Sequence, residues 1–347
     1  MNLEEMLSIA RQQGFTDVHV SPDFPLIGRK NGKLTVLEAS PVSEDSIRKI
    51  ADSIMSEAEK LKFFAQDPCV FMYETPEHER FRVSAYFTGK KPVLSYRIVN
   101  DKITSPLRLG LPKDVMDLAS LKAGLVILAA PSSEGKTTVT GALIEWLNQN
   151  RNYHVLYAAL PAEHGFASRR SLIHTADLSG NDPVKVLRNA LFADFDAVFF
   201  DAPLTKESLE AVFPLCEAGK LCVLTVSAKS AADAISHIIN MYSGKERNRV
   251  KEQFCAHIKA IYAQRKITAQ EGTFVAYECL KPSPKVYEAI AEEDLKMIDE
   301  VLSEEETMRS LDESLAKLVR DHALTKAEAA AYIKDEERFS KYLIEGK

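Results

Sequence analysis

The 347-residue chain lacks several features that would place it in a specialised class of protein. It has no apolar stretch approaching the roughly 18 residues that a membrane-spanning helix needs. Its net charge of −6 argues against a nucleic-acid binder. Its first residues, MNLEEMLSIARQQG, lack the apolar centre of a secretory signal. Its five cysteines are widely spread and include no Cys-x-x-Cys pair, so they indicate neither a disulfide framework nor a metal site. We therefore expect a soluble protein of the reducing cytosol.

The residues that are present suffice for two domains, since 46% of them are apolar and the length favours more than one core. Residues 1–99 mix helix and strand patterns and predict an α+β domain. A short helix near 3–10 precedes a strand at 18–20, and Asn31-Gly32 marks a hairpin turn. Ser43 is expected to cap one long helix whose apolar face extends to Leu61. Further strands are predicted at 69–73, 80–87 and 93–98.

The pattern changes after residues 100–112, which are polar, contain two prolines and a glycine, and are the expected linker. Residues 113–347 alternate between buried strands and helices, which is typical of a parallel-sheet α/β domain. Strands are predicted near 125–130, 154–159, 197–201, 221–226, 260–267 and 273–279. A helical tail follows, and its last helix is expected to begin at a capping box formed by Thr325 and Glu328.

The most informative segment is LVILAAPSSEGKTT at residues 125–138, where a buried strand leads through a sharp turn into a helix. This is the arrangement of a phosphate-binding P-loop, in which backbone N–H groups and a lysine surround phosphate oxygens. The first glycine of the usual pattern is Ala130 here, and Glu134 adds a negative charge to the loop. An ordinary strand-to-helix turn is the alternative. The residues predicted to bind ATP are Ser132, Ser133, Gly135, Lys136, Thr137 and Thr138, with Thr137 also holding Mg²⁺.

Motifs along nearly the whole chain resemble those of the PilT-like twitching-motility retraction ATPases of the type II/IV secretion motor superfamily. The resembling segments are DVHVS at 17–21, RKNG at 29–32, RFRVSAY at 80–86, the P-loop, LRNAL at 187–191 and AGKL at 218–221. The resemblance implies an N-terminal PAS-like α+β domain followed by a RecA-like P-loop ATPase domain. It also implies a ring-shaped hexamer in which arginines of the N-terminal domain approach the phosphates. Arg82 and Arg97 are the matching positions.

The chain departs from this family at its catalytic boxes. The family's acidic box is replaced by AALPAE at 158–163, which keeps only the acid at Glu163. The family's Walker B strand ends in Gly-Glu, whereas here it ends in Asp201-Ala202, so the water-orienting glutamate falls on an alanine. Lys220 and Ser227 stand where the family has histidines. Glu163 and Asp201 are thus the candidate catalytic acids, and Asp201 is a second candidate Mg²⁺ ligand.

These departures predict a subunit that binds ATP but hydrolyses it poorly. Binding depends on backbone amides, Lys136 and the metal, whereas hydrolysis also needs a positioned water. An active retraction ATPase with relocated acids and a scaffold that binds no nucleotide are the alternatives. The resemblance further implies a cytoplasmic protein, peripheral at the inner membrane, that acts with a pilus or secretion platform protein. The ring would be a homo-hexamer or would include an active paralogue. Neither a nucleic-acid partner nor a transmembrane segment is expected.

Overall fold

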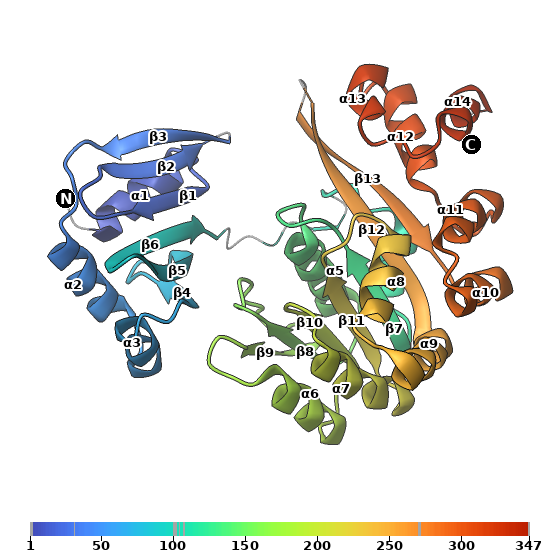
Figure 1. Ribbon diagram of the computed structural model, residues 1–347, viewed down its shortest axis with the longest axis horizontal. Helices are drawn as coiled ribbons and strands as arrows, with labels where there is room; N and C mark the ends of the chain where they lie inside the picture. Colours follow the sequence, from blue (N-terminus) through green and yellow to red (C-terminus); the bar gives the residue numbers. More distant parts are fainter. Residues whose placement is uncertain are drawn as a thin grey trace. The chain divides into compact units, whose positions relative to one another are not determined.

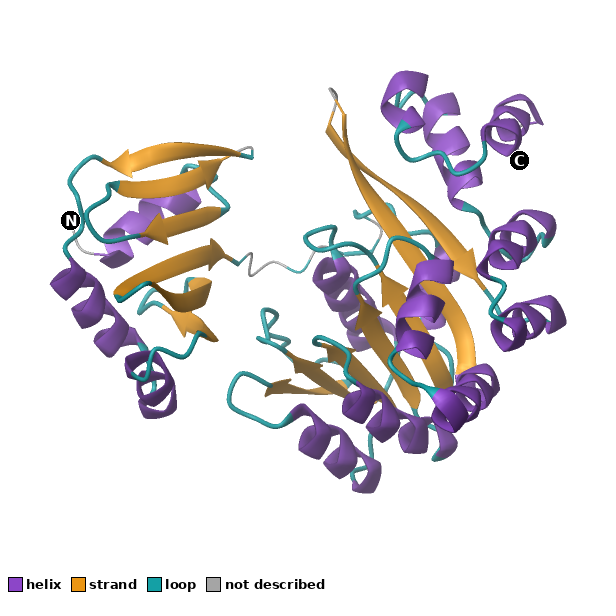
Figure 2. Ribbon diagram, in the orientation of Figure 1, coloured by secondary structure: helices purple, strands orange, loops and turns teal. Residues whose placement is uncertain are grey.

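The computed structural model describes residues 3–30, 32–99, 103, 105–106, 108–269 and 272–345. Asn31 of the predicted hairpin turn, and residues 100–102, 104 and 107 of the predicted linker, lie outside this range. The chain forms two compact units. Unit 1 comprises Met1–Ile103, Ala159–Gly165 and Asp177–Asn181, and unit 2 comprises Thr104–Ala158, Phe166–Ala176 and Asp182–Lys347. Helices and strands occur in both units, as Figure 2 shows by colour.

Unit 1 is built on a six-stranded antiparallel sheet with the order β3-β2-β1-β6-β5-β4 (Figure 1). Helices α1, α2 and α3 contribute buried side chains to its core, among them Leu7, Ile47 and Phe63. The elements are α1 (Leu3–Gln12), β1 (Asp17–Val20), β2 (Leu26–Lys30), β3 (Lys33–Glu38), α2 (Glu44–Ile54), α3 (Glu57–Phe64), β4 (Cys69–Glu74), β5 (Arg80–Thr88) and β6 (Lys91–Ile98). The α+β pattern predicted for this part of the chain is confirmed.

The single long helix predicted after Ser43 is wrong, because the structure has two helices there. The first, α2, ends before Met55, and Ser56 caps the second, α3. The Ser56 hydroxyl accepts from the Glu59 amide, and the Glu59 carboxylate accepts from the Ser56 amide at 2.7 Å. This capping box starts a new helix in place of a continued one. Leu61, which was expected on the apolar face, is 75% exposed.

Unit 2 contains a seven-stranded sheet with the order β13-β12-β7-β11-β10-β8-β9. Strands β12, β7, β11 and β10 run parallel, and β13 pairs antiparallel with β12. Every residue of β7 and β11 is buried, as expected for central parallel strands. The strands are β7 (Gly124–Ala129), β8 (His154–Ala159), β9 (Leu172–Asp177), β10 (Ala197–Asp201), β11 (Leu221–Val226), β12 (Ile258–Ala269) and β13 (Gly272–Leu280). Of these strands only β9 was not predicted, because half of the residues in LIHTAD are polar and half are exposed.

Helices connect most of these strands and pack along the sheet (Figure 1). The helices up to β12 are α4 (Lys113–Leu118), α5 (Lys136–Asn150), α6 (Pro183–Phe192), α7 (Lys206–Glu217), α8 (Ala231–Asn240) and α9 (Gly244–His257). The tail contains α10 (Pro284–Glu292), α11 (Leu295–Glu304), α12 (Leu311–Arg320), α13 (Lys326–Ala330) and α14 (Glu336–Glu345). The capping box of Thr325 and Glu328 is confirmed, but the helix it starts is not the last, since α14 follows. Among the described residues, no helix has the length and apolar character to cross a bilayer.

Candidate nucleotide site

The predicted P-loop lies between the buried strand β7 and helix α5. Because β7 is flanked by β12 and β11, the loop leaves the sheet at the carboxyl end of a central strand, where α/β folds bind ligands. Gly135 is the N-cap of α5, and its φ of 94° is a left-handed conformation that favours glycine. As a glycine, this N-cap has no side chain to accept hydrogen bonds from the first amides of the helix. The amides of its first turn are therefore suited to an external acceptor such as a phosphate.

The side chain of Lys136 folds back onto the loop that precedes it. Its Nζ donates to the carbonyl oxygens of Ala130 and Pro131, at 2.7 and 3.0 Å. Burial lowers the pKa of Lys136, whereas the nearby carboxylates of Asp201 and Glu134 act to raise it. The ammonium group is thus held inside the loop by exchangeable contacts to carbonyl oxygens, which a phosphate could replace.

Glu134, the acid within the loop, is bound to strand β12. Its carboxylate accepts from the backbone N–H of Lys266 at 3.0 Å and from Nε of Arg265 at 3.2 Å. The Gln264 side-chain amide donates to the backbone carbonyl of the same residue. The negative charge that the sequence places in the loop therefore has fixed partners, and none of these partners was predicted.

Asp201 ends strand β10, and Oγ1 of Thr225 on the neighbouring strand β11 donates to its carboxylate at 2.8 Å. Asp201 acts on the pKa of Lys136, so the acid and the loop lysine are electrostatically coupled. Thr225 was missed, although a lone polar residue in the apolar strand LCVLTV was a signal for it. Within the described ranges no group of three or more His, Cys, Asp or Glu side chains could hold a metal ion. Hydroxyl and carboxylate oxygens such as those of Thr137 and Asp201 are nonetheless the donors that Mg²⁺ prefers.

The remaining candidate residues, Arg82, Arg97 and Glu163, belong to unit 1. Nη1 of Arg82 lies 2.6 Å from the Glu163 carboxylate. Arg80, two residues earlier on β5, donates to the carbonyl oxygens of Ala162 and Glu163, each at 2.7 Å. Arg97 pairs instead with Asp17 at 3.0 Å. Both candidate arginines are thus neutralised by acids of their own unit, and Arg80 is an additional residue that holds Glu163 in place.

Lys220 stands at a position where a histidine was expected. Its ammonium group donates to the carbonyl oxygens of Ala193 and Phe195, at 2.9 and 3.0 Å. These contacts secure the loop that precedes β10 and lie at the amino end of β11. Ser227, the other substituted position, directly follows the carboxyl end of β11. Lys220 therefore has a local structural role in unit 2.

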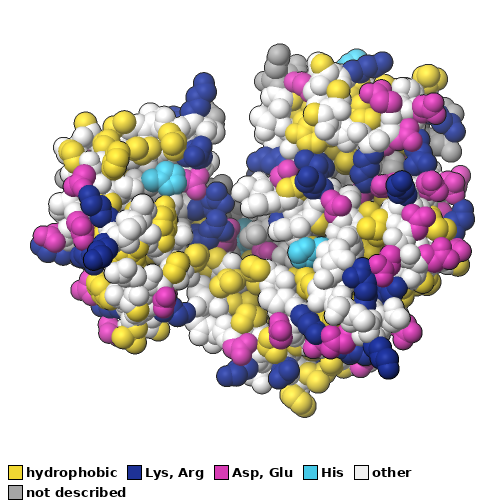
Figure 3. All heavy atoms as spheres, in the orientation of Figure 1, with side chains coloured by type: hydrophobic (Ala, Val, Ile, Leu, Met, Phe, Trp, Pro, Cys, Tyr) yellow, Lys and Arg dark blue, Asp and Glu magenta, His cyan; other side chains and the backbone are white. Residues whose placement is uncertain are grey.

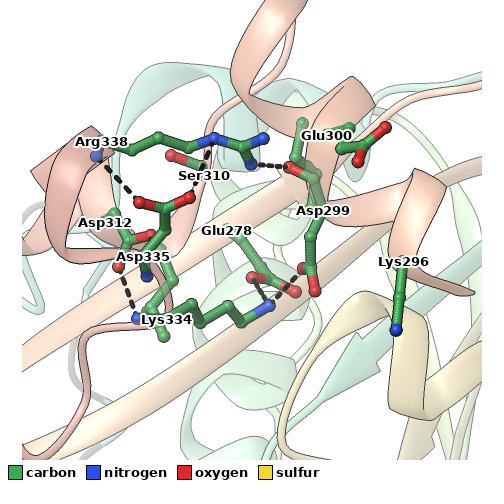
Figure 4. Close-up of a pocket in the computed structure, with 11 residues that line it drawn as sticks. Glu278, Lys296, Asp299, Glu300, Ser310, Asp312, Lys334, Asp335 and Arg338 are labelled. Carbon is green, nitrogen blue, oxygen red and sulfur yellow. Dashed lines mark hydrogen bonds and ion pairs between the residues drawn. The ribbon is translucent and has the colours of Figure 1, made fainter.

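A second polar cluster lies apart from the loop, in a cavity of about 360 Å³ between β13 and the C-terminal helices (Figure 4). The Lys334 ammonium contacts the carboxylates of Glu278 and Asp299 at 2.8 and 2.7 Å. Burial raises the pKa of Glu278. Burial also acts to lower the pKa of Lys334, but the two carboxylates outweigh it and the net shift is upward. On the face shown in Figure 3, acidic and basic side chains are mixed over unit 2.

No family model matches the chain. It is similar along its length to curated proteins, however. It is 23% identical over 345 residues to the type IV pilus retraction ATPase PilT of Pseudomonas aeruginosa, covering 98% of this chain and 100% of that protein. It is 26% identical over 313 residues to a twitching motility protein of Neisseria gonorrhoeae, covering 88% and 83%. Over most of its length the chain is thus similar to PilT-like motor ATPases.

The fold agrees with this similarity. A crystal structure of the pilus retraction motor PilT with bound ADP superposes with a TM-score of 0.86 at 24% identity, covering 98% of this chain and 99% of the other. The PilT-like chain therefore has the predicted fold, an N-terminal domain followed by a RecA-like ATPase domain.

Proposed function

We propose that this PilT-like chain is a subunit of a type IV pilus or related secretion motor that binds Mg-ATP and hydrolyses it slowly. One observation carries the proposal. A loop with the features of a phosphate site, including an inward-directed Lys136, lies at the carboxyl end of the central strand β7, and the nearby strand β10 ends at Asp201 and is followed by Ala202. The loop favours binding, whereas the alanine removes the carboxylate that would orient the attacking water.

The binding residues follow from the chemistry of their groups. Main-chain amides of the loop and the Lys136 ammonium would contact phosphate oxygens, and Thr137 and Asp201 would supply oxygen donors to Mg²⁺. Arg82 and Arg97 are paired with Glu163 and Asp17, so a phosphate would compete with these carboxylates for the two arginines. The proposed nucleotide-binding residues are Ser132, Ser133, Gly135, Lys136, Thr137, Thr138, Arg82 and Arg97.

The proposed setting follows from the relatives, which are named as a pilus retraction ATPase and a twitching motility protein. We infer a cytoplasmic, ring-shaped hexamer at the inner membrane, docked on a pilus or secretion platform protein. A ring mixed with an active paralogue would let a slow subunit modulate a fast one.

Calorimetry with Mg-ATP on the full chain tests the binding step. The wild type should bind, Lys136→Ala should not, and Lys206→Ala, which removes an exposed lysine paired with Glu246, should leave binding unchanged. Absence of binding by the wild type would refute the nucleotide role and favour a scaffold.

Steady-state turnover tests the second step. Wild-type turnover should be low, and Ala202→Glu, which returns a carboxylate to the end of β10, should raise it. Turnover by the wild type equal to that of a PilT measured alongside, and abolished by Lys136→Ala, would refute slow hydrolysis.

An active ATPase with relocated acids is the second candidate, favoured by the coupling of Asp201 to Lys136 and its hydrogen bond from Thr225. In that case Asp201→Asn or Glu163→Gln should lower turnover by about 10²–10⁴, the usual effect of losing a general base. If neither substitution had an effect, this candidate would be excluded.

A further inference from the structure

The acid inside the phosphate loop poses an electrostatic problem for the proposed nucleotide site. A phosphate-binding loop works through positive potential from amides and lysine, and a free carboxylate among them would repel the phosphates. Glu134 directly precedes Gly135 and Lys136, so its charge lies close to the expected phosphate position. Its carboxylate also acts on the pKa of Lys136 itself.

The structure provides a partner for this charge in Arg265 of strand β12. Nε of Arg265 lies 3.2 Å from the Glu134 carboxylate, and the next amide along the strand, that of Lys266, donates to the same oxygen at 3.0 Å. The two side chains are 23% and 19% exposed, so water screens this pair only in part. One side chain and one backbone amide of β12 thus both bind the Glu134 carboxylate.

Arg265 is itself held in place from its other side. Its guanidinium lies over the ring of Tyr332, which follows α13, with 5.2 Å between the guanidinium carbon and the ring centroid. The neighbouring Gln264 donates to the backbone carbonyl of Glu134, and a Cβ at Gly135 would come within 3.0 Å of that amide nitrogen. Three consecutive residues of β12 therefore fix both the main chain and the side chain of Glu134.

We propose that Arg265 is a positioning residue of the nucleotide site, which keeps the Glu134 carboxylate bound to β12 and away from the incoming phosphates. The proposal rests on the proposed binding of Mg-ATP. In this proposal Arg265 affects nucleotide binding wholly through Glu134. Removing both charges should therefore restore the nucleotide affinity that is lost when the arginine alone is removed.

A double-mutant cycle on the full chain tests this, with Mg-ATP affinity measured by calorimetry. Arg265→Gln should weaken binding by roughly 5- to 30-fold, the effect of one to two kcal/mol. Glu134→Gln should bind at least as tightly as the wild type, and Glu134→Gln combined with Arg265→Gln should match Glu134→Gln alone. The defect of Arg265→Gln should also shrink at high salt, because the repulsion is screened.

Arg249→Gln is a matched control, since Arg249 forms an ion pair of the same 3.2 Å length with Glu210 on the surface and should not affect binding. A double variant as weak as Arg265→Gln would overturn the inference, because Arg265 would then act through the fold or on the nucleotide directly. Unchanged binding by Arg265→Gln would overturn it too while leaving the proposed function intact. No binding by any of the proteins would overturn both.

Discussion

Removal of Lys334 is expected to destabilise unit 2 strongly, because it would leave a buried carboxylate without its cationic partner. Lys334 precedes α14 and contacts Glu278 of β13, whose side chain is only 2% exposed. Glu278 also accepts from the amide of Ala231 at the start of α8. The substitution Lys334→Met keeps much of the volume of the side chain and removes the charge together with the hydrogen bonds that the ammonium donates to Glu278 and Asp299.

The size of the effect follows from burial. Removing one partner of a buried ion pair costs about 3–5 kcal/mol, since the remaining charge has no compensation. Lys334 is 27% exposed and lies in a cavity, so solvent can reach part of the pair. We therefore expect a loss of about 3 kcal/mol in the free energy of unfolding, at the low end of that range.

Urea unfolding followed by tryptophan fluorescence is the appropriate assay. The single tryptophan, Trp146, lies in α5 of unit 2, so its signal reports on the unit that contains the cluster. With a slope of about 3 kcal/mol per molar urea, the midpoint should fall by about 1 M. Lys285→Met is the control, because the pair of Lys285 with Glu304 is equally short at 2.7 Å but exposed, and its loss should change the midpoint little.

The pH dependence gives a second check on the same reasoning. With Lys334 gone, burial should leave the folded-state pKa of Glu278 further above its unfolded value, so its cost appears as pH rises through that pKa. The stability deficit should therefore be smaller at about pH 5 than at pH 7. A deficit below about 1 kcal/mol at pH 7, or one that does not change with pH, would refute the reasoning.

Three further outcomes are expected. Phe199→Ala, in the buried strand β10, should cost about 3–5 kcal/mol by urea unfolding, whereas Phe192→Ala, at a ring that is 88% exposed, should cost almost nothing. Gly135→Val should abolish Mg-ATP binding in calorimetry without unfolding the chain, since its φ is 94° and a Cβ there meets Gln264 at 3.0 Å; normal affinity would contradict this. Arg247 and Lys251 lower the pKa of Glu293 from 4.5 to about 2. The stability this contributes should be complete above about pH 4.5 and lost as the pH falls toward 2, and an NMR titration of Glu293 near its ordinary pKa would disprove it.

The sequence by itself determined the elements whose signals are local. The apolar run at 125–129 followed by Gly135-Lys136 located strand β7, the loop and the start of α5, because strand burial and helix start depend on neighbouring residues. The same holds for the alternating strands and helices of unit 2, and for the capping box at Thr325. The local pattern was misleading at one place. The apolar helical spacing that reaches Leu61 predicted one helix, but the cap at Ser56 starts a second helix there.

Only the tertiary structure decided which charges meet. Glu134 and Arg265 are 131 residues apart in the sequence, and Arg82 and Glu163 are 81 apart. Thr225 and Asp201 lie on the neighbouring strands β11 and β10. A sequence gives the charge of each such group, but its partner depends on strand order and register, which arise from packing of the whole sheet. The loop could therefore be predicted from the sequence. The partners of its carboxylate on β12 could be identified only from the structure, in which β12 pairs with β7.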